Sequence, residues 1–218
     1  MTARFRDFHL EGEDTLGQGK YLRLRRVHLR NVYQDGSFSE PYFCEFVDRP
    51  AHGTDAVVVG LWRKKKGAVQ VLLRQGLRPA LRFGRKQGSQ PQPVSRLWEA
   101  VAGILEPGDR GLEGIKHRAV LEAWEEAGVQ LPQTDVCFLG PAMFASPGMT
   151  PEAFHFLAAE VKTEPMRPPG DGSPMEQGAE TAWFLLDEAL SKCETGEIVD
   201  LKTEVLLRRL KTARLAPG

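Results

Sequence analysis

Residues 103–129, GILEPGDRGLEGIKHRAVLEAWEEAGV, contain the pattern that decides the fold. A turn rich in glycine and proline leads into a helical run that closes with three carboxylates, Glu122, Glu125 and Glu126. At about 3.6 residues per turn these positions share one helix face, where like charges destabilise an isolated helix. This face therefore either binds a cation or is simply well solvated.

A hard divalent cation suits carboxylates at this spacing. Mg²⁺ prefers oxygen ligands and is usually held in proteins by one or two carboxylates together with substrate phosphates. Such an ion offsets the charge of a diphosphate and can turn a bound water molecule into a nucleophile. On spacing alone a solvated glutamate-rich face is the more common explanation, so the metal hypothesis depends on the rest of the chain.

The composition limits the classes of function. The 218 residues are enough for one large domain, or for one domain with an appendage. Lys+Arg and Asp+Glu are equal at 29 each, which argues against nucleic acid and acidic membrane surfaces as partners. No apolar run reaches ~18 residues, so no membrane span is expected. Three widely spaced cysteines, Cys44, Cys137 and Cys193, form no disulfide framework and predict a reducing cytoplasm.

The N-terminal quarter of the chain differs from the remainder. Residues 1–18 are polar and are expected to be loosely held. Residues 21–33 and 41–47 predict a β-hairpin closed by an Asp-Gly turn. This hairpin is either a dimerisation arm or an ordinary edge hairpin of the main sheet. We therefore divide the chain into an arm, residues 1–54, and a main domain, residues 55–218.

The main domain alternates predicted strands with few helices. Strands are expected at residues 56–62, 69–74, 97–102, 136–139, 154–161 and 181–186, and loops at 82–93 and 162–178. Asp187 is expected to cap a short helix that Gly196 ends, and residues 200–214 predict a C-terminal helix. Hairpin-connected strands with helices packed on a mixed sheet indicate an α+β fold.

The opening stretch resembles the Nudix box, whose pattern is G-x5-E-x7-R-E-U-x-E-E-x-G-U with U aliphatic. Gly103 matches the first glycine, Asp109 takes the place of the first glutamate, and the LEAWEEAGV end is in register. Two departures are plain. Eleven residues follow Asp109 instead of seven, an extended loop, and Leu121 replaces the arginine that orients the glutamates in the family. Arg118, one turn earlier on the same face, is a candidate substitute.

The flanking segments VLLRQGLRP, LWEAVAG and FASPGMTPEAFHFLAAEV are similar to the ADP-ribose pyrophosphatase branch of that family. The resemblance implies a Nudix-type α/β/α sandwich with a mixed sheet, and an N-terminal β-hairpin arm that forms a homodimer. It also implies hydrolysis of the pyrophosphate bond of ADP-ribose or a related nucleoside diphosphate sugar, to a nucleoside monophosphate and a sugar phosphate. The implied cofactor is Mg²⁺, with Mn²⁺ as an alternative.

The resemblance assigns roles residue by residue. It implies metal ligands at the Ala102 carbonyl, Glu122, Glu125 and Glu126, substrate contacts at Arg74, Gln75, Arg78, Glu99 and Glu152, and catalytic roles for Glu125, Glu176 or Glu180. Glu176 is the favoured general base because it lies deeper in the 162–178 loop. The competing interpretations are a solvated strand end for Arg74, a strand cap for Arg78, a surface residue for Glu99 and a plain loop glutamate for Glu176.

A second class of function remains open on the sequence. Leu121 and the longer box loop also suit a Nudix-fold nucleotide-binding or regulatory module with little catalysis. Within the enzyme hypothesis, the identity of the nucleotide sugar is open as well.

Overall fold

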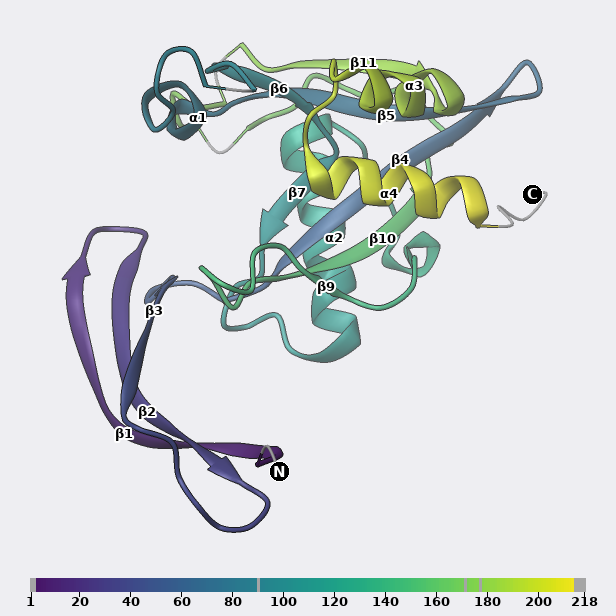
Figure 1. Ribbon diagram of the computed structural model, residues 1–218. Coiled ribbons are helices and arrows are strands. Elements are labelled where there is room, and N and C mark those ends of the chain that lie inside the picture. The colour runs from purple at the N-terminus through teal and green to yellow at the C-terminus, as the bar shows by residue number, and fades with distance from the viewer. Residues whose placement is uncertain (1–2, 90, 171, 177, 214–218) are drawn as a thin grey trace. The chain divides into compact units, whose positions relative to one another are not determined.

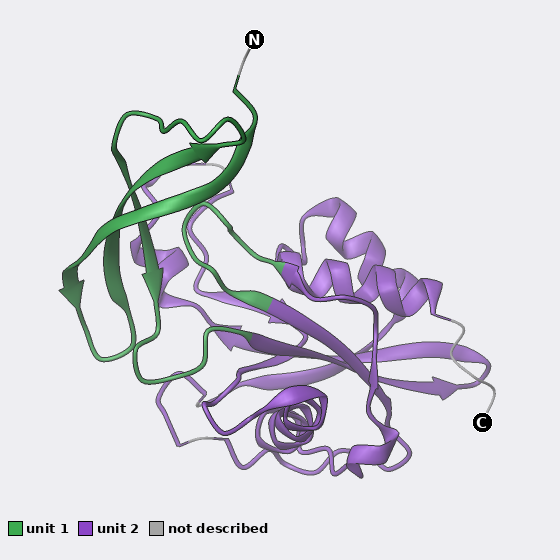
Figure 2. Cartoon of the chain, turned by 90° about the horizontal axis from the view of Figure 1, so that it is seen from below, with its two compact units in different colours: residues 1–55, 144–153 green, residues 56–143, 154–218 purple. Residues whose placement is uncertain are grey.

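The computed structural model describes residues 3–89, 91–170, 172–176 and 178–213. The chain divides into two compact units, which Figure 2 shows in different colours. The first comprises residues 1–55 and 144–153, and the second comprises residues 56–143 and 154–218.

The first unit contains a three-stranded antiparallel sheet in the order β1-β2-β3, from β1 (Phe5–Gln18), β2 (Arg23–Tyr33) and β3 (Tyr42–Asp48). The predicted hairpin corresponds to β2 and β3. The expectation of a loosely held N-terminus is wrong for residues 5–18, which pair along the whole of β2. Three register shifts interrupt the strand alternation of β1, and its acids pair with basic side chains of β2, so its polar sequence hid a strand.

The second unit is built on a mixed sheet in the order β11-β5-β4-β10-β8 (Figure 1). The strands are β4 (Ala56–Lys65), β5 (Ala68–Leu77), β8 (Cys137–Phe138), β10 (Ala153–Glu160) and β11 (Glu180–Leu185). Strand β10 runs parallel to β4, and the other three pairings along this order are antiparallel. Shorter strands extend the sheet: β6 (Arg96–Glu99) pairs with β5, β7 (Val101–Ile104) with β4, and β9 (Met143–Phe144) with β10.

Helices cover both faces of this sheet, because the side chains of a strand alternate between faces. Val57 and Val59 of β4 pack with helix α2 (Gly111–Ala127) in one buried cluster. Val58 packs with helices α3 (Leu186–Thr195) and α4 (Leu201–Thr212) in the other. The expected α/β/α sandwich with a mixed sheet is confirmed. The remaining short elements are α1 (Pro79–Phe83) and a 3₁₀ turn, η1 (Gln133–Asp135).

The strand expected at residues 97–102 is in fact two strands, β6 and β7, which meet at Ala100. The Ala100 N–H donates to Thr203 Oγ1 at 2.8 Å instead of to a neighbouring strand. The chain can therefore change its pairing partner there, from β5 to β4. This change places Glu99 and Ala102 beside different strands.

Two helix starts differ from expectation. Helix α3 begins two residues earlier than expected, at Leu186 instead of Glu188, so Asp187 lies in its first turn and is not its N-cap. Gly196, with a φ of 82°, ends it as expected. Helix α4 begins after Asp200, whose side chain accepts from the Thr203 N–H at 3.0 Å. Its predicted last residue, Arg214, lies outside the described residues.

The extra box residues lengthen helix α2 instead of forming a loop, because the helix already begins at Gly111. Its first turn lies so close to the preceding chain that a Cβ on Gly114 would be 2.4 Å from the Asp109 carbonyl carbon. Among the other loops, residues 82–93 begin inside α1, with Pro79 at the start of that helix. The described part of residues 162–178 is a loop, as expected.

Candidate active site

Two glutamates of α2, Glu122 and Glu126, lie against the backbone of β7. A Cβ on Gly103 would be 1.9 Å from the Glu122 carboxyl carbon, so only glycine leaves room for this carboxylate. The Ala102 N–H donates to Glu126 Oε2 at 3.1 Å. The N–H and C=O of one strand residue face the same edge, so the Ala102 carbonyl faces this edge too.

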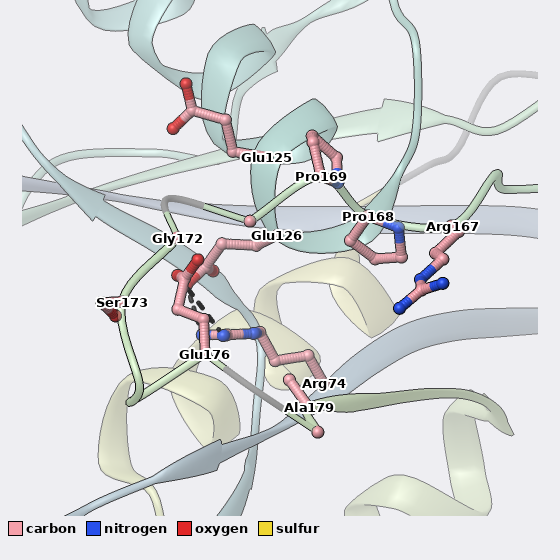
Figure 3. Close-up of a pocket in the computed structure, with 12 residues that line it drawn as sticks. Arg74, Glu125, Glu126, Arg167, Pro168, Pro169, Gly172, Ser173, Glu176 and Ala179 are labelled. Carbon is pink, nitrogen blue, oxygen red and sulfur yellow. Dashed lines mark hydrogen bonds and ion pairs between the residues drawn. The ribbon is translucent and has the colours of Figure 1, made fainter.

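Arg74, in strand β5, joins two acids from distant parts of the chain. Its side chain is buried, and its Nη1 bonds Glu126 Oε1. Its Nη2 lies 3.5 Å from Glu176 Oε1. Figure 3 shows these three side chains converging, while the Glu125 carboxylate points away from them. The structure therefore brings a strand, the box helix and the 162–178 loop together at one cluster.

A cavity of about 380 Å³ lies beside this cluster. Its lining residues include Arg74, Glu125, Glu126, Arg167 and Glu176, together with prolines and glycines of the same loop. Three acids and two bases thus surround a space large enough for part of a small polar molecule.

Burial and mutual repulsion change the acidity of the helix carboxylates. Burial, with the neighbouring Glu126 and Glu125, raises the pKa of Glu122 to about 8. Burial raises the pKa of Glu126 to about 7, although Arg74 and the Ala102 N–H act in the opposite direction. These two carboxyl groups therefore ionise less readily than ordinary glutamates unless more positive charge is supplied.

Leu121 stands in the place of the family arginine, and Arg118, one helical turn before Glu122, makes the ionic contacts instead. Its Nε donates to Asp109 Oδ2 at 2.8 Å, and its Nη1 lies 3.8 Å from Glu122 Oε1. The same Asp109 oxygen accepts from the Glu106 N–H at 2.8 Å. Arg118 thus links the turn before α2 to the first glutamate of the cluster, a contact that Leu121 could not make.

A second ionic cluster surrounds Glu99, which is buried at the end of β6. Glu99 Oε2 accepts from Arg78 Nη2 at 2.7 Å and from Lys202 Nζ at 2.6 Å. Its other oxygen packs on Gly76, where a Cβ would be 2.8 Å away. Burial opposes ionisation, but Lys202 and Arg78 outweigh it and lower the pKa of Glu99. The surface interpretation of Glu99 is therefore wrong.

Lys202, in the first turn of α4, is the residue of this cluster that the sequence analysis missed. Besides Glu99 it contacts Asp200 Oδ1 at 2.9 Å. Its only signal in the sequence was its position two residues after an N-cap aspartate. That position does not reveal a partner 103 residues earlier in the chain.

Besides Arg78, Glu99, Ala102 and Glu122, whose contacts are given above, three more predicted site residues do not line the cavity. Gln75 Oε1 accepts from Arg96 Nη1 at 3.2 Å. Glu180, the first residue of β11, is exposed and is paired opposite Gln75. Glu152 belongs to the first unit, where Arg49 Nη2 donates to it at 2.6 Å.

Within the described residues, no group of three or more His, Cys, Asp or Glu side chains is gathered closely enough to hold a metal ion. The contacts explain this arrangement, because Glu126 is engaged by Arg74 and Glu125 points away from the cluster. The donors themselves, carboxylates and a backbone carbonyl, are of the oxygen type that Mg²⁺ prefers.

Known proteins resemble the chain in sequence and in fold, although no protein-family model matches it. It is 30% identical over 203 residues to the GDP-mannose pyrophosphatase of Escherichia coli strain K12, covering 93% of this chain and 95% of that protein. The GDP-mannose pyrophosphatase of Shigella boydii serotype 4 (strain Sb227) matches with the same identity and coverage. The crystal structure of an ADP compounds hydrolase matches with a TM-score of 0.65 at 12% identity, over 96% of this chain and 95% of that one.

The relatives in sequence, together with the layered fold and the box helix, define a pyrophosphohydrolase class of enzyme. The structural match supports the fold, and the sequence matches extend over nearly the whole length of the relatives. The chain belongs to the Nudix hydrolase family, as the box and its flanking segments indicated.

Proposed function

We propose that the chain hydrolyses the pyrophosphate bond of a nucleoside diphosphate sugar, giving a nucleoside monophosphate and a sugar phosphate. The observation that carries this proposal is the largely buried Arg74–Glu126 pair, joined by Glu176, beside a cavity. ADP-ribose and GDP-mannose are the first substrates to test, the second because the relatives in sequence are GDP-mannose pyrophosphatases.

Glu122, Glu126 and the Ala102 carbonyl would hold Mg²⁺ or Mn²⁺, with Glu125 as a further ligand or as the group that orients water. When bound, such an ion offsets diphosphate charge and lowers the pKa of a bound water. Glu126 would then give up Arg74 as its partner. The released guanidinium would be free to bind a phosphate oxygen, which favours the substrate role of Arg74.

Glu176 is the proposed general base, which would accept the proton of the attacking water. It lines the cavity and lies near Arg74, whereas Glu180 does not line it. Arg78 and Glu99 would support the substrate site through their ion pair. Direct substrate contacts of Gln75 and Glu152 stay predictions.

One assay tests the enzyme hypothesis against a binding module. Release of monophosphate from a panel of nucleoside diphosphate sugars should need Mg²⁺ and stop on chelation. Glu126→Gln should lower turnover by about a hundredfold or more, because losing even the hydrogen-bond partner of a metal ligand typically costs about tenfold to a hundredfold, and Glu126 is a proposed ligand itself. Glu164→Gln, an exposed glutamate paired with Arg63, is the matched control. Nucleotide binding without hydrolysis across the panel would refute the enzyme hypothesis in favour of the binding module.

We also propose that the sheet of the first unit mediates a homodimer. Leu10, Leu29 and Tyr42 are direct cross-strand partners and so share one face of that sheet. Leu10 and the nearby Phe8 are more than half exposed, at 59% and 58%. Exposed apolar patches commonly mark interaction sites. Sedimentation should give a dimer that Leu10→Glu weakens, and a wild-type monomer would refute this proposal.

We also propose a cytoplasmic location for the chain. No helix within the described residues is long and apolar enough to cross a membrane. Cys44, Cys137 and Cys193 are all free thiols, which is consistent with the proposed cytoplasmic location. Fractionation of cells that express the chain would test it.

A further inference from the structure

Residues 166–170, MRPPG, are fastened to the C-terminal end of helix α2 at both of their ends. The Met166 N–H donates to the Gly128 carbonyl at 2.9 Å, and the Gly170 N–H donates to the Glu125 carbonyl at 3.0 Å. The approach is close, because a Cβ on Gly128 would lie 2.0 Å from the Met166 carbonyl oxygen. The segment is therefore positioned by the same helix that carries the glutamate cluster.

The sequence between the two anchors is stiff. Pro168 and Pro169 fix their own φ angles, and a proline also restricts the residue before it. Arg167 stands directly before this pair, so its backbone has little freedom. Two anchors and two prolines thus hold the base of one basic side chain at a set place near the C-terminal end of α2.

Arg167 lines the cavity on the side of this segment. Figure 3 shows its guanidinium turned toward the side where Arg74 lies. Arg74 is already matched by Glu126 and Glu176. No ion pair or hydrogen bond of the Arg167 guanidinium occurs among the residues that the structure describes. It is therefore the cation of the described cavity lining whose charge is not matched by a carboxylate.

We propose that Arg167 is a substrate-binding residue that contacts the diphosphate of the substrate from the loop side of the cavity. This inference rests on the proposed function. A guanidinium can bind two phosphate oxygens at once through parallel N–H donors, and it stays charged at all physiological pH values. Arg74 and Arg167 would then face the diphosphate from the strand and from the loop.

The simpler alternative is that Arg167 is a solvated loop cation whose removal changes nothing. The two explanations predict different effects on substrate affinity when the guanidinium is removed or is replaced by an ammonium group. A direct contact loses affinity with alanine and regains part of it with lysine, which supplies a point charge without the two-donor geometry. If Arg167 is only a solvated cation, the wild type, Arg167→Ala and Arg167→Lys should all bind the substrate with the same affinity.

The experiment compares Arg167→Ala and Arg167→Lys with Lys162→Ala. Lys162 begins the same loop, but it is exposed and pairs with Asp135, so its loss removes one positive charge away from the cavity. Binding is measured by calorimetry with the α,β-methylene analogue of ADP-ribose, in which carbon replaces the bridging oxygen. Turnover of ADP-ribose and GDP-mannose gives kcat and KM.

Arg167→Ala should raise the Kd for the analogue and the KM about tenfold to a hundredfold, as expected for a lost hydrogen bond to a charged group. Arg167→Lys should recover part of the loss, and Lys162→Ala should stay within about twofold of the wild type. Unchanged analogue binding by Arg167→Ala would overturn the inference while leaving the proposed function intact.

The two hypotheses fail separately. If the wild type hydrolyses no substrate of the panel but binds the analogue, the proposed function is wrong and the calorimetric comparison alone decides the role of Arg167. If the wild type binds neither the analogue nor inorganic pyrophosphate, Arg167 has no diphosphate to contact and the inference is overturned as well.

Discussion

At the scale of single residues, buried glutamates of this chain differ in acidity because of the cations that they meet. Glu99 contacts both Arg78 and Lys202, and its pKa is lowered. For Glu122, burial raises the pKa to about 8, and its basic partner Arg118 is 3.8 Å away. The sequence shows seven similar glutamate candidates, but it does not show which of them has a matching base.

Glu176 and Glu180 provide a matched test of the general base. Glu176→Gln should lower kcat about a hundredfold or more with little change in KM, because general-base catalysis typically contributes that order of rate. Glu180→Gln should be nearly neutral, since Glu180 is exposed at the start of β11 and does not line the cavity. Steady-state kinetics on both variants decide the assignment, and a larger loss in Glu180→Gln would reverse it.

At the scale of elements, sequence patterns predicted the ends of helices better than their starts. Gly128 and Gly196 both end helices in the left-handed conformation that favours glycine. The start of α2 was missed because its N-cap, Arg110, makes no side-chain cap and the first turn contains two glycines. Periodicity also missed β1, whose bulges and charges resemble a polar tail.

The contacts of the site were less predictable than its elements. The box motif identified Glu122 and Glu126 and the glycine against which Glu122 packs. The partners of these acids come from other elements. Arg74 reaches Glu126 from 52 residues away, and Lys202 reaches Glu99 from 103 residues away. Pairs this distant follow from sheet order and helix packing, which local patterns do not encode.

Gly128 and Gly196, which end helices α2 and α3, allow the cost of backbone strain to be distinguished from the cost of a clash with the 166–170 segment. Alanine at either position adopts a positive φ at a cost of about 1 kcal/mol. A Cβ at Gly196 meets nothing within 4 Å, whereas one at Gly128 meets the Met166 carbonyl. Gly128→Ala should therefore reduce the free energy of unfolding by at least about 1 kcal/mol more than Gly196→Ala. Urea denaturation measures both, and equal losses would show that the 166–170 segment yields freely.

At the scale of the whole molecule, a chain with no net charge has concentrated acids where its proposed substrate is also anionic. Glu122 and Glu126 are buried on one helix, while the bases that face them, Arg74 and Arg118, are each shared with another acid. Folding without a cation therefore gathers negative charge that the unfolded chain keeps apart in water. This arrangement should make the stability of the folded protein depend on both pH and divalent cations.

The sign of the pH effect follows from the raised pKa values. Burial lifts the pKa of Glu122 to about 8 and that of Glu126 to about 7, above the ordinary carboxyl value, so between about pH 5 and 8 the folded state binds more protons than the unfolded state. The stability of the metal-free protein should fall as pH rises through this range, by at most about 1.4 kcal/mol per pH unit for each acid. Acids with lowered pKa values, such as Glu99 and Asp109, stabilise the folded protein while they are ionised. They lose this contribution only when they are protonated at lower pH, so they do not mask the trend.

Thermal unfolding in chelator at several pH values measures this dependence, and Glu122→Gln/Glu126→Gln is the comparison. The double variant should show a flatter decline of Tm between pH 5 and 8, because neutral amides replace the acids that lose protons. Added Mg²⁺ should raise the Tm of the wild type more at pH 8 than at pH 5, since metal binding requires deprotonated ligands. Parallel Tm curves for the two proteins would show that these carboxylates ionise in the folded state as easily as in water.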